Sequence, residues 1–262
     1  MLPIPPADPA TLAALCALAF VAGLVDAVVG GGGLIQTPAL FVLLPGASVP
    51  TVLGTNKLAG VWGTAAAAAT YARRVPVDVA GTVAMAVAAA AAAWLGAHAV
   101  GLVSRDVFRP LLVVALVTLG AYTLARRDFG ALVREGVSVR ARRVAMVAVG
   151  TAVGFYDGFF GPGGGALFVF GLVALAGLDF LRASAASKLV NVATNVAALA
   201  VFVAAGHVLW AVALPMAACN LGGGLVGSRL ALRHGAGFVR VVFVAVVALL
   251  LARLVWEMAA GR

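Results

Sequence analysis

The sequence predicts an all-α polytopic membrane protein made of two inverted-topology repeats, and three observations lead to this class. Hydrophobic residues make up 64% of the chain and charged residues 10%, whereas roughly a quarter of the residues in a soluble domain are charged. Several apolar runs approach the roughly 20 residues that a helix needs to cross the hydrocarbon core of a bilayer. The third observation is an internal duplication, since unusual residues coincide when the chain is shifted against itself by 131 positions, half of its 262 residues.

The duplication is clearest in the charged residues and the glycines. Asp26 aligns with Asp157, and Lys57 aligns with Lys188, the only other lysine of the chain. Four glycines of the first half, Gly23, Gly30, Gly32 and Gly33, align with Gly154, Gly161, Gly163 and Gly164. A duplicated apolar chain with paired intramembrane charges and paired glycine breaks is typical of secondary transporters.

The apolar runs predict five helical segments in each half, joined by a polar connection. We expect a first transmembrane repeat at residues 1–125, a linker at 126–143 and a second transmembrane repeat at 144–262. The expected segments are 11–29, 34–44, 52–72, 79–103 and 108–125 in the first repeat, and 144–160, 165–177, 184–205, 208–228 and 237–256 in the second.

The second segment of each repeat is too short to cross a membrane. A helix over 34–44 would be about 16 Å long, about half of the hydrocarbon thickness of roughly 30 Å. This segment follows a glycine cluster, as does 165–177. We therefore expect each repeat to contain about three full transmembrane helices and a glycine-broken pair of half-inserted helices. Irregular backbone at that depth needs protein or a water-filled cavity around it.

The distribution of arginines predicts the orientation in the membrane. The linker 126–143 carries six arginines, and placing it in the cytoplasm leaves twelve arginines inside against four outside, as the positive-inside rule requires. Each repeat has an odd number of crossings, so the second repeat is inserted upside down relative to the first. The two glycine breaks then enter from opposite sides, and we expect them to meet near the midplane.

The net charge of +9 does not predict a nucleic-acid partner. The arginines lie in loops between apolar runs and form no continuous basic face, so the positive-inside rule accounts for them. An enzyme is not expected either, because the sequence has no histidine cluster, no nucleophile with a base and no metal-ligand spacing. Cys16 and Cys219 fit no metal motif. We therefore predict neither a metal nor a cofactor.

Two glycine clusters are candidates for binding an anion through the backbone. One runs from Gly30 to Gly33, and the other runs from Gly161 to Gly165 and contains Pro162. An apolar helix follows each cluster, so free N–H groups and the positive end of a helix dipole point into the break. Tight helix packing is the alternative role of these glycines. The candidate backbone contacts are Gly31, Gly32, Gly33, Gly163, Gly164 and Gly165.

The two lysines are candidates for attracting the anion. Lys188 shares one face of a helix with Ser184, Asn191 and Asn195, and a polar face on an apolar membrane helix points into the bundle. A lysine at such depth needs an acid, an anion or water beside it. Substrate contact and a structural ion pair with an aspartate therefore both stay open. The candidate substrate-binding side chains are Lys57, Lys188, Asn56, Asn191, Asn195 and Ser187.

Asp26 and Asp157 are candidates for coupling transport to an ion. Each lies four residues before its glycine break, near the C-terminal end of the first segment of its repeat, where the helix dipole disfavours a negative charge. We expect each to be protonated, paired with lysine or bonded to backbone donors in the break. A carboxylate in this position can relay a proton or couple an ion. The alternative is that it holds the turn through backbone N–H groups.

These residues lie in stretches that resemble the sulfite exporter TauE/SafE family of membrane transporters. The matching stretches are GLVDAVVGGGGLIQTPAL and GTNKLAG in the first half, with GFYDGFFGPGGG and ASAASKLVNVATNVAALAVFVAAGHVLW in the second. The resemblance extends over nearly the whole chain. The family is similar in having duplicated halves and is associated with moving sulfite, organosulfonates and related small anions. The resemblance therefore implies a multi-pass transporter of the bacterial cytoplasmic membrane.

Together these observations predict a secondary transporter for a small anion, such as sulfite, an organosulfonate or a related sulfur or carboxylate oxyanion. In this hypothesis the lysines attract the anion, the glycine breaks and asparagines bind it, and the aspartates couple its movement to protons or Na⁺. An anion channel or a uniporter without ion coupling is the alternative. The expected partners are the anionic substrate, the coupling ion and the lipid bilayer, and the oligomeric state is left open.

Overall fold

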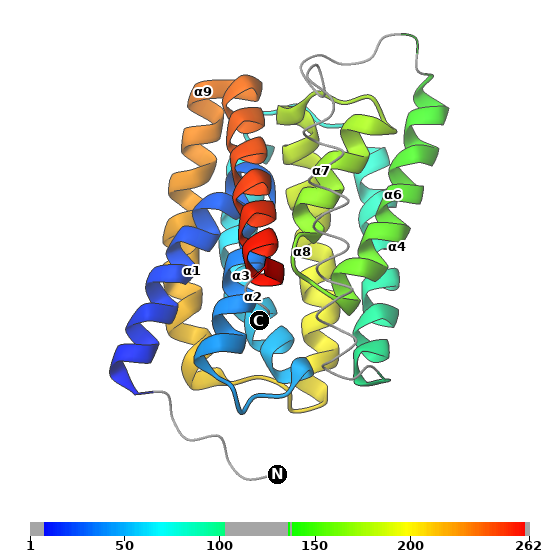
Figure 1. The fold of residues 1–262 in the computed structure, drawn as a ribbon. Coiled ribbons are helices and arrows are strands. Elements are labelled where there is room, and N and C mark those ends of the chain that lie inside the picture. The colour runs from blue at the N-terminus through cyan, green and yellow to red at the C-terminus, as the bar shows by residue number, and fades with distance from the viewer. Residues whose placement is uncertain (1–7, 103–135, 137, 260–262) are drawn as a thin grey trace.

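The computed structural model describes residues 8–102, 136 and 138–259, and within them it is a bundle of helices (Figure 1). No strand is formed in this part of the chain. The elements, in chain order, are α1 (Pro9–Val29), α2 (Gly32–Leu43), α3 (Val49–Ala72), α4 (Val79–Ala99), the short 3₁₀ helix η1 (Val100–Leu102), α6 (Val139–Phe159), α7 (Gly164–Ala174), α8 (Phe180–Ala204) and α9 (Trp210–Ala259).

The second half repeats the helix boundaries of the first half. Shifting α3 and α4 by 131 positions, half of the 262 residues, places their first residues on Phe180 and Trp210, where α8 and α9 begin. The short helix α7 follows α6 just as α2 follows α1. The all-helical class and the order of long and short segments are confirmed for the described residues. The predicted segment 108–125 and most of the predicted linker 126–143 lie outside them.

α9 contains two of the predicted segments. It is interrupted at Gly235, whose φ of 73° and ψ of −166° are not helical and are essentially restricted to glycine. The chain turns back at this residue, so the last helix runs in the opposite direction along the bundle (Figure 1). The break separates the segments predicted at 208–228 and 237–256.

Capping residues fix where five of the helices begin. In each case an aspartate or serine accepts a hydrogen bond from a free N–H group of the first turn. Without such a partner these N–H groups would be unsatisfied. The capping residues are Asp8 of α1, Ser48 of α3, Asp78 of α4, Ser138 of α6 and Asp179 of α8.

Four helices of the described chain are long and apolar enough to cross a membrane, namely Pro9–Val29, Val79–Ala99, Phe180–Ala204 and Trp210–Gly235. These helices are those of a multi-pass membrane protein. One prediction needs correction, because α1, with 21 residues, has the length of a full span rather than of a half-inserted helix. α6 also has 21 residues. Only α2 and α7, with 12 and 11 residues, are short as predicted.

Glycines bring α1 against α9 and α6 against α4. A Cβ atom at Gly23 would overlap the backbone oxygen of Asn220, and one at Gly154 would overlap that of Ala89. The two contacts are equivalent under the shift of 131 positions, half of the 262 residues: Gly23 corresponds to Gly154, and Ala89 corresponds to Asn220. Small residues permit such close approach in membrane bundles. The two halves therefore pack on each other through matching contacts with the partners exchanged.

α3 and α8 form the centre of the bundle. They pack against each other, and each also packs on a helix of the opposite half, α3 on α9 and α8 on α4. Most of their polar side chains, including both lysines, are buried. Polar groups facing lipid would be costly, so this central position determines where a polar site can form.

Candidate functional site

The two glycine breaks meet inside the bundle. α1 ends at Gly30 with a φ of 82°, and α7 begins after Gly163 with a φ of 81°, conformations that favour glycine. A Cβ atom at Gly30 would overlap the backbone of Gly165, and one at Gly33 would lie 3.1 Å from the Cα atom of Pro162. This contact brings the ends of α1 and α6 and the starts of α2 and α7 to one place.

Each aspartate lies at the start of the short helix that follows it. The backbone N–H of Gly32, at the start of α2, donates to Oδ1 of Asp26 over 3.4 Å. Asp157 takes the equivalent place at α7, where a Cβ atom on Gly164 would overlap its carboxylate. The positive end of a helix dipole stabilises a negative charge. In this conformation the protein's own carboxylates therefore occupy the helix starts at which the sequence predicts anion binding.

Two buried ion pairs connect the halves. The Nζ atom of Lys57 lies 2.6 Å from Oδ2 of Asp157, and the Nζ atom of Lys188 lies 3.2 Å from Oδ2 of Asp26. Each half therefore supplies a lysine to the aspartate of the other half. Lys57 is 3% exposed and Lys188 is 0% exposed, so neither ammonium group relies on bulk water. The sequence left two partners open for the lysines, and in this conformation the partner is an acid.

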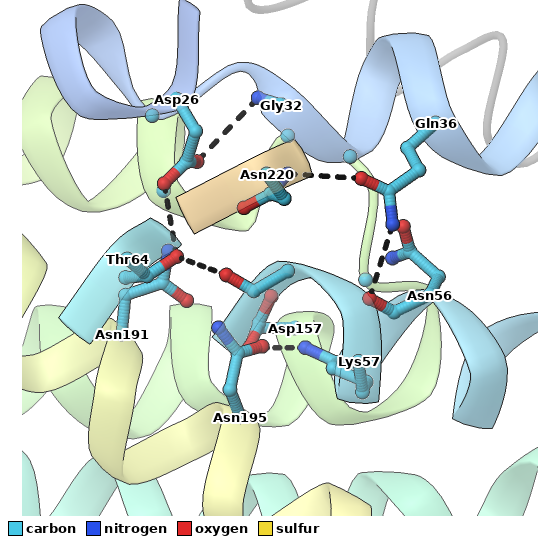
Figure 2. Close-up of a pocket in the computed structure, with 16 residues that line it drawn as sticks. Asp26, Gly32, Gln36, Asn56, Lys57, Thr64, Asp157, Asn191, Asn195 and Asn220 are labelled. Carbon is cyan, nitrogen blue, oxygen red and sulfur yellow. Dashed lines mark hydrogen bonds and ion pairs between the residues drawn. The ribbon is translucent and has the colours of Figure 1, made fainter. Parts of the chain in front are cut away.

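A polar cavity of about 40 Å³ borders on both aspartates (Figure 2). It has room for only a few water molecules, since one water needs about 10–15 Å³. Residues of both halves line the cavity, and they are Asp26, Gly30, Gly32, Gly33, Gln36, Asn56, Lys57, Gly60, Thr64, Asp157, Gly161, Gly163, Gly165, Asn191, Asn195 and Asn220.

Amide side chains surround one part of the cavity (Figure 2). The Nε2 group of Gln36 donates to the backbone oxygen of Asn56 over 3.4 Å, and Nδ2 of Asn220 donates to Oε1 of Gln36 over 3.1 Å. Nδ2 of Asn220 also donates to the backbone oxygen of Ala19 over 3.0 Å. The Oδ1 atom of Asn220 is buried without a hydrogen-bond partner. Buried polar atoms are rarely left unpaired, so this oxygen can accept a bond from water or from a bound molecule.

The structure brings most of the predicted site residues to the cavity. The ones that line it are Asp26, Gly32, Gly33, Asn56, Lys57, Asp157, Gly163, Gly165, Asn191 and Asn195. Gly31, Gly164, Ser187 and Lys188 do not line it. The Ser187 hydroxyl donates to the backbone oxygen of Ser184 over 3.0 Å, and Lys188 contacts Asp26 instead of the cavity.

Sequence analysis missed Gln36 and Asn220. Each is a single amide in an apolar segment, and a lone polar group at such a depth needs a partner, which is the signal that could have identified it. The positions 131 residues away, half of the 262-residue chain, are occupied by Leu167 and Ala89. The predicted amides, Asn56, Asn191 and Asn195, all lie on the two helices that carry the lysines, so amides on α2 and α9 were not selected.

The chemistry available at the cavity is that of charge and hydrogen bonding. Within the described residues, no group of three or more His, Cys, Asp and Glu side chains is arranged to hold a metal ion. The histidines have partners away from the cavity: His98 and His234 contact backbone oxygens four residues before them, and His207 contacts Thr51 of the other half. Ammonium, carboxylate and amide groups around a small polar space suit the binding of small ions.

Comparison with known proteins identifies the family. Residues 15–254 match the family described as Sulfite exporter TauE/SafE. The chain is 39% identical over 240 residues to the probable membrane transporter protein ORF9 of Sinorhizobium sp, covering 90% of this chain and 88% of the relative. It is 34% identical over 255 residues to the probable membrane transporter protein YfcA of Escherichia coli K12, covering 95% and 91%. It is 30% identical over 250 residues to a probable membrane transporter protein of Haemophilus influenzae, covering 94% and 95%.

No solved structure gives a significant match. The family and the relatives are membrane transporters, which agrees with the prediction of a transporter rather than an enzyme. The match also confirms the resemblance carried by the glycine-rich and lysine-containing stretches. The chain belongs to the sulfite exporter TauE/SafE family of membrane transporters.

Proposed function

We propose that the protein is a secondary transporter that moves a small oxyanion, such as sulfite, an organosulfonate or a related carboxylate, across the bacterial cytoplasmic membrane. The observation that carries this proposal is the pair of ion bridges, Lys57–Asp157 and Lys188–Asp26, that join the two halves beside a polar cavity. Buried ionisable groups in membrane helices mark ion and substrate pathways. The family to which the chain belongs supports the class of cargo.

Charge balance at the cavity determines how an anion enters. The two lysines and two aspartates carry no net charge together. An anion brought into this buried site adds a negative charge, which is costly unless a positive charge accompanies it. A proton on one aspartate supplies that charge and releases the paired lysine, whose ammonium group then binds the anion. Na⁺ bound by the carboxylate would balance the charge in the same way.

The arrangement of the helices supports alternating access by two inverted halves. α1 and α6 run in opposite directions along the bundle (Figure 1), and the contacts Gly23–Asn220 and Gly154–Ala89 are equivalent in the two halves. Both features are expected of repeats related by an axis in the membrane plane. In this proposal the halves rock against each other where the glycine breaks meet. The cavity of about 40 Å³ must widen in this motion to admit an oxyanion.

Transport by proteoliposomes tests this function. Purified protein is reconstituted and supplied with labelled sulfite, methanesulfonate, taurine or succinate, with a pH gradient, with a Na⁺ gradient or with neither. The expected result is accumulation of an oxyanion above equilibrium under the pH gradient, relative to liposomes without protein. Accumulation driven only by the Na⁺ gradient would show that Na⁺, and not the proton, is the coupling ion. Equilibration without accumulation would favour a channel or uniporter, and no flux of any anion would contradict the proposal.

A further inference from the structure

The two ion pairs differ in their surroundings although they occupy equivalent positions in the two halves. We propose that Lys57–Asp157 is the pair that opens during transport, with Asp157 taking up the coupled proton and Lys57 binding the anion. Lys188–Asp26 stays closed and holds the two halves together. This inference rests on the proposed function and assigns its two steps to particular groups.

Three donors from three helices hold the Asp26 carboxylate. It accepts hydrogen bonds from Nζ of Lys188 over 3.2 Å and from the backbone N–H of Gly32 over 3.4 Å. The third donor is the Thr64 hydroxyl, which is shared between Oδ2 of Asp26 and the backbone oxygen of Gly60, each 3.0 Å away. To leave Lys188, the carboxylate would have to give up charge-assisted bonds on several sides. The Asp26 pair is therefore built to remain closed.

A single donor holds the Asp157 carboxylate. Among the described residues, its one hydrogen bond comes from Nζ of Lys57 over 2.6 Å. The corresponding helix position in the other half, which supplies Thr64 to Asp26, is occupied by Asn195, and Asn195 makes no hydrogen bond to Asp157. Protonation of Asp157 therefore disturbs only one hydrogen bond of its carboxylate, the one from Lys57.

The two lysines also differ in their access to the cavity. Lys57 lines it, whereas Lys188 is 0% exposed and does not. An anion in the cavity can approach the Lys57 ammonium group without passing through protein. The same anion would have to displace Asp26 to reach Lys188. The access of the lysine and the hydrogen bonding of the carboxylate thus select the same pair.

No other charged group of the described chain competes for Asp157. Its helix, α6, packs on α4, α7 and α8. α7 carries no titratable residue, and the α4 residue His98 is bonded to a backbone oxygen at an exposed position. The charged residues of α8 have other partners, since Lys188 is paired with Asp26 and Arg182 with Asp179. On α6 itself, the hydroxyl of Tyr156 donates to a backbone oxygen. Lys57 is therefore the charged partner that responds when Asp157 takes up a proton.

The transport step balances in charge and protons. A proton binds Oδ2 of Asp157 and neutralises it, while Lys57 keeps its own protons and its positive charge. The anion takes the place of the carboxylate beside the ammonium group. One proton and one negative charge thus move together, and both are released when Asp157 loses its proton on the other side and pairs with Lys57 again.

Matched substitutions of the two aspartates test the assignment. Asp157→Asn and Asp26→Asn are reconstituted and supplied with labelled methanesulfonate, which stays ionised near neutral pH. Asp78→Asn is the control, because Asp78 caps α4 and does not line the cavity. Each protein is measured for exchange without a gradient and for accumulation under a gradient of one pH unit. One proton per anion supports an about tenfold accumulation under that gradient.

We expect Asp157→Asn to retain exchange and to lose the accumulation, since a neutral amide stands in for the protonated acid. Asp26→Asn is expected to slow exchange and uptake together while still accumulating the anion. Loss of exchange in Asp157→Asn, or loss of accumulation in Asp26→Asn alone, would overturn the assignment. If Asp26→Asn does not fold, Thr64→Val takes its place, because it removes one hydrogen bond to the Asp26 carboxylate. The same outcomes are expected for it. Absence of exchange in the unmodified protein would instead overturn the proposed function.

Discussion

The two halves of the chain meet at the cavity with the same charges and with three shared break glycines but with different neutral polar groups. Asp26 and Lys57 recur as Asp157 and Lys188, and three glycines of each break recur with them. The pairs of equivalent positions that differ in their polar side chains are Gln36 and Leu167, Asn56 and Ser187, Gly60 and Asn191, Thr64 and Asn195, and Ala89 and Asn220.

This difference separates the residues that the fold requires in both halves from the residues that make the two sides of the cavity unequal. Each lysine needs an acid from the opposite half, and each glycine break touches the backbone of the other break, so these residues occur in both halves. A neutral side chain has no such obligatory partner and can differ. The hydrogen bond from Thr64 to Asp26 exists on one side only, and it makes two equivalent ion pairs unequal.

The largest predicted effect comes from removing one member of an ion pair. Lys57→Met leaves the carboxylate of Asp157 buried and unpaired, and breaking a buried pair in this way costs about 3–5 kcal/mol of unfolding free energy. Adding Asp157→Leu should recover most of that loss, because no charge then remains without a partner. Unfolding of the single and double variants in detergent provides the measurement. Additive losses would show that the two residues do not interact.

The second prediction concerns the contact between the breaks. Gly30→Ala places a Cβ atom against the backbone of Gly165 at a residue with a φ of 82°. Steric strain and the unfavourable backbone conformation should cost about 3 kcal/mol of stability. Gly60→Ala is the matched control, because its Cβ would have nothing within 4 Å and alanine favours a helix. Thermal unfolding in detergent should separate the two variants, and equal stabilities would contradict the contact.

A smaller effect is expected where the halves differ in an amide. Asn220→Ala installs the residue found at the equivalent position, Ala89, and removes the donor to Gln36 and to the backbone oxygen of Ala19. Leaving buried acceptors unsatisfied should cost about 1–3 kcal/mol. The loss should shrink when Gln36→Leu is combined with it, since one orphaned acceptor is then removed. A full loss in the double variant would show that the two amides act independently.

The smallest effect is expected at an exposed ion pair, which contrasts with the two buried ones. Arg143 hydrogen-bonds to Asp78 and holds the pKa of that carboxyl below its usual value. The stabilisation is therefore present above the pKa of an unfolded aspartate, about 3.9, and is lost as the pH falls through the lower folded value. Solvent screens exposed pairs, so Arg143→Gln should barely change stability at neutral pH. A large loss there would contradict this expectation.

Sequence analysis could predict the helices, the glycine breaks and the charged residues of the site. The repetition of Asp26 and Lys57 in the second half identified them, because a charge in an apolar segment is rare and its recurrence at the same position is rarer. The sequence could not decide which acid each lysine meets. Lys57 and Asp157 are 100 positions apart, and only the packing of α3 between the halves brings them together.

The errors of the sequence analysis also have physical causes. α1 was expected to be half-inserted because a short helix follows it, yet its own run of apolar residues extends back to Pro9 and is long enough to span. Gln36 and Asn220 were missed because amides were sought on the two lysine-containing helices, α3 and α8, whereas these two lie on α2 and α9. Tertiary hydrogen bonds between single amides leave no periodic pattern in a sequence.

The most direct test of the central claim is a calorimetric titration of methanesulfonate into the purified protein and its Lys57→Ala variant, repeated in buffers of different ionisation enthalpy. The account predicts binding to the unmodified protein with uptake of about one proton per anion, because the anion must replace a carboxylate that becomes protonated. It predicts no measurable binding to Lys57→Ala. Equal binding by both proteins, or binding without proton uptake, would contradict the claim that the anion takes the place of Asp157 beside Lys57.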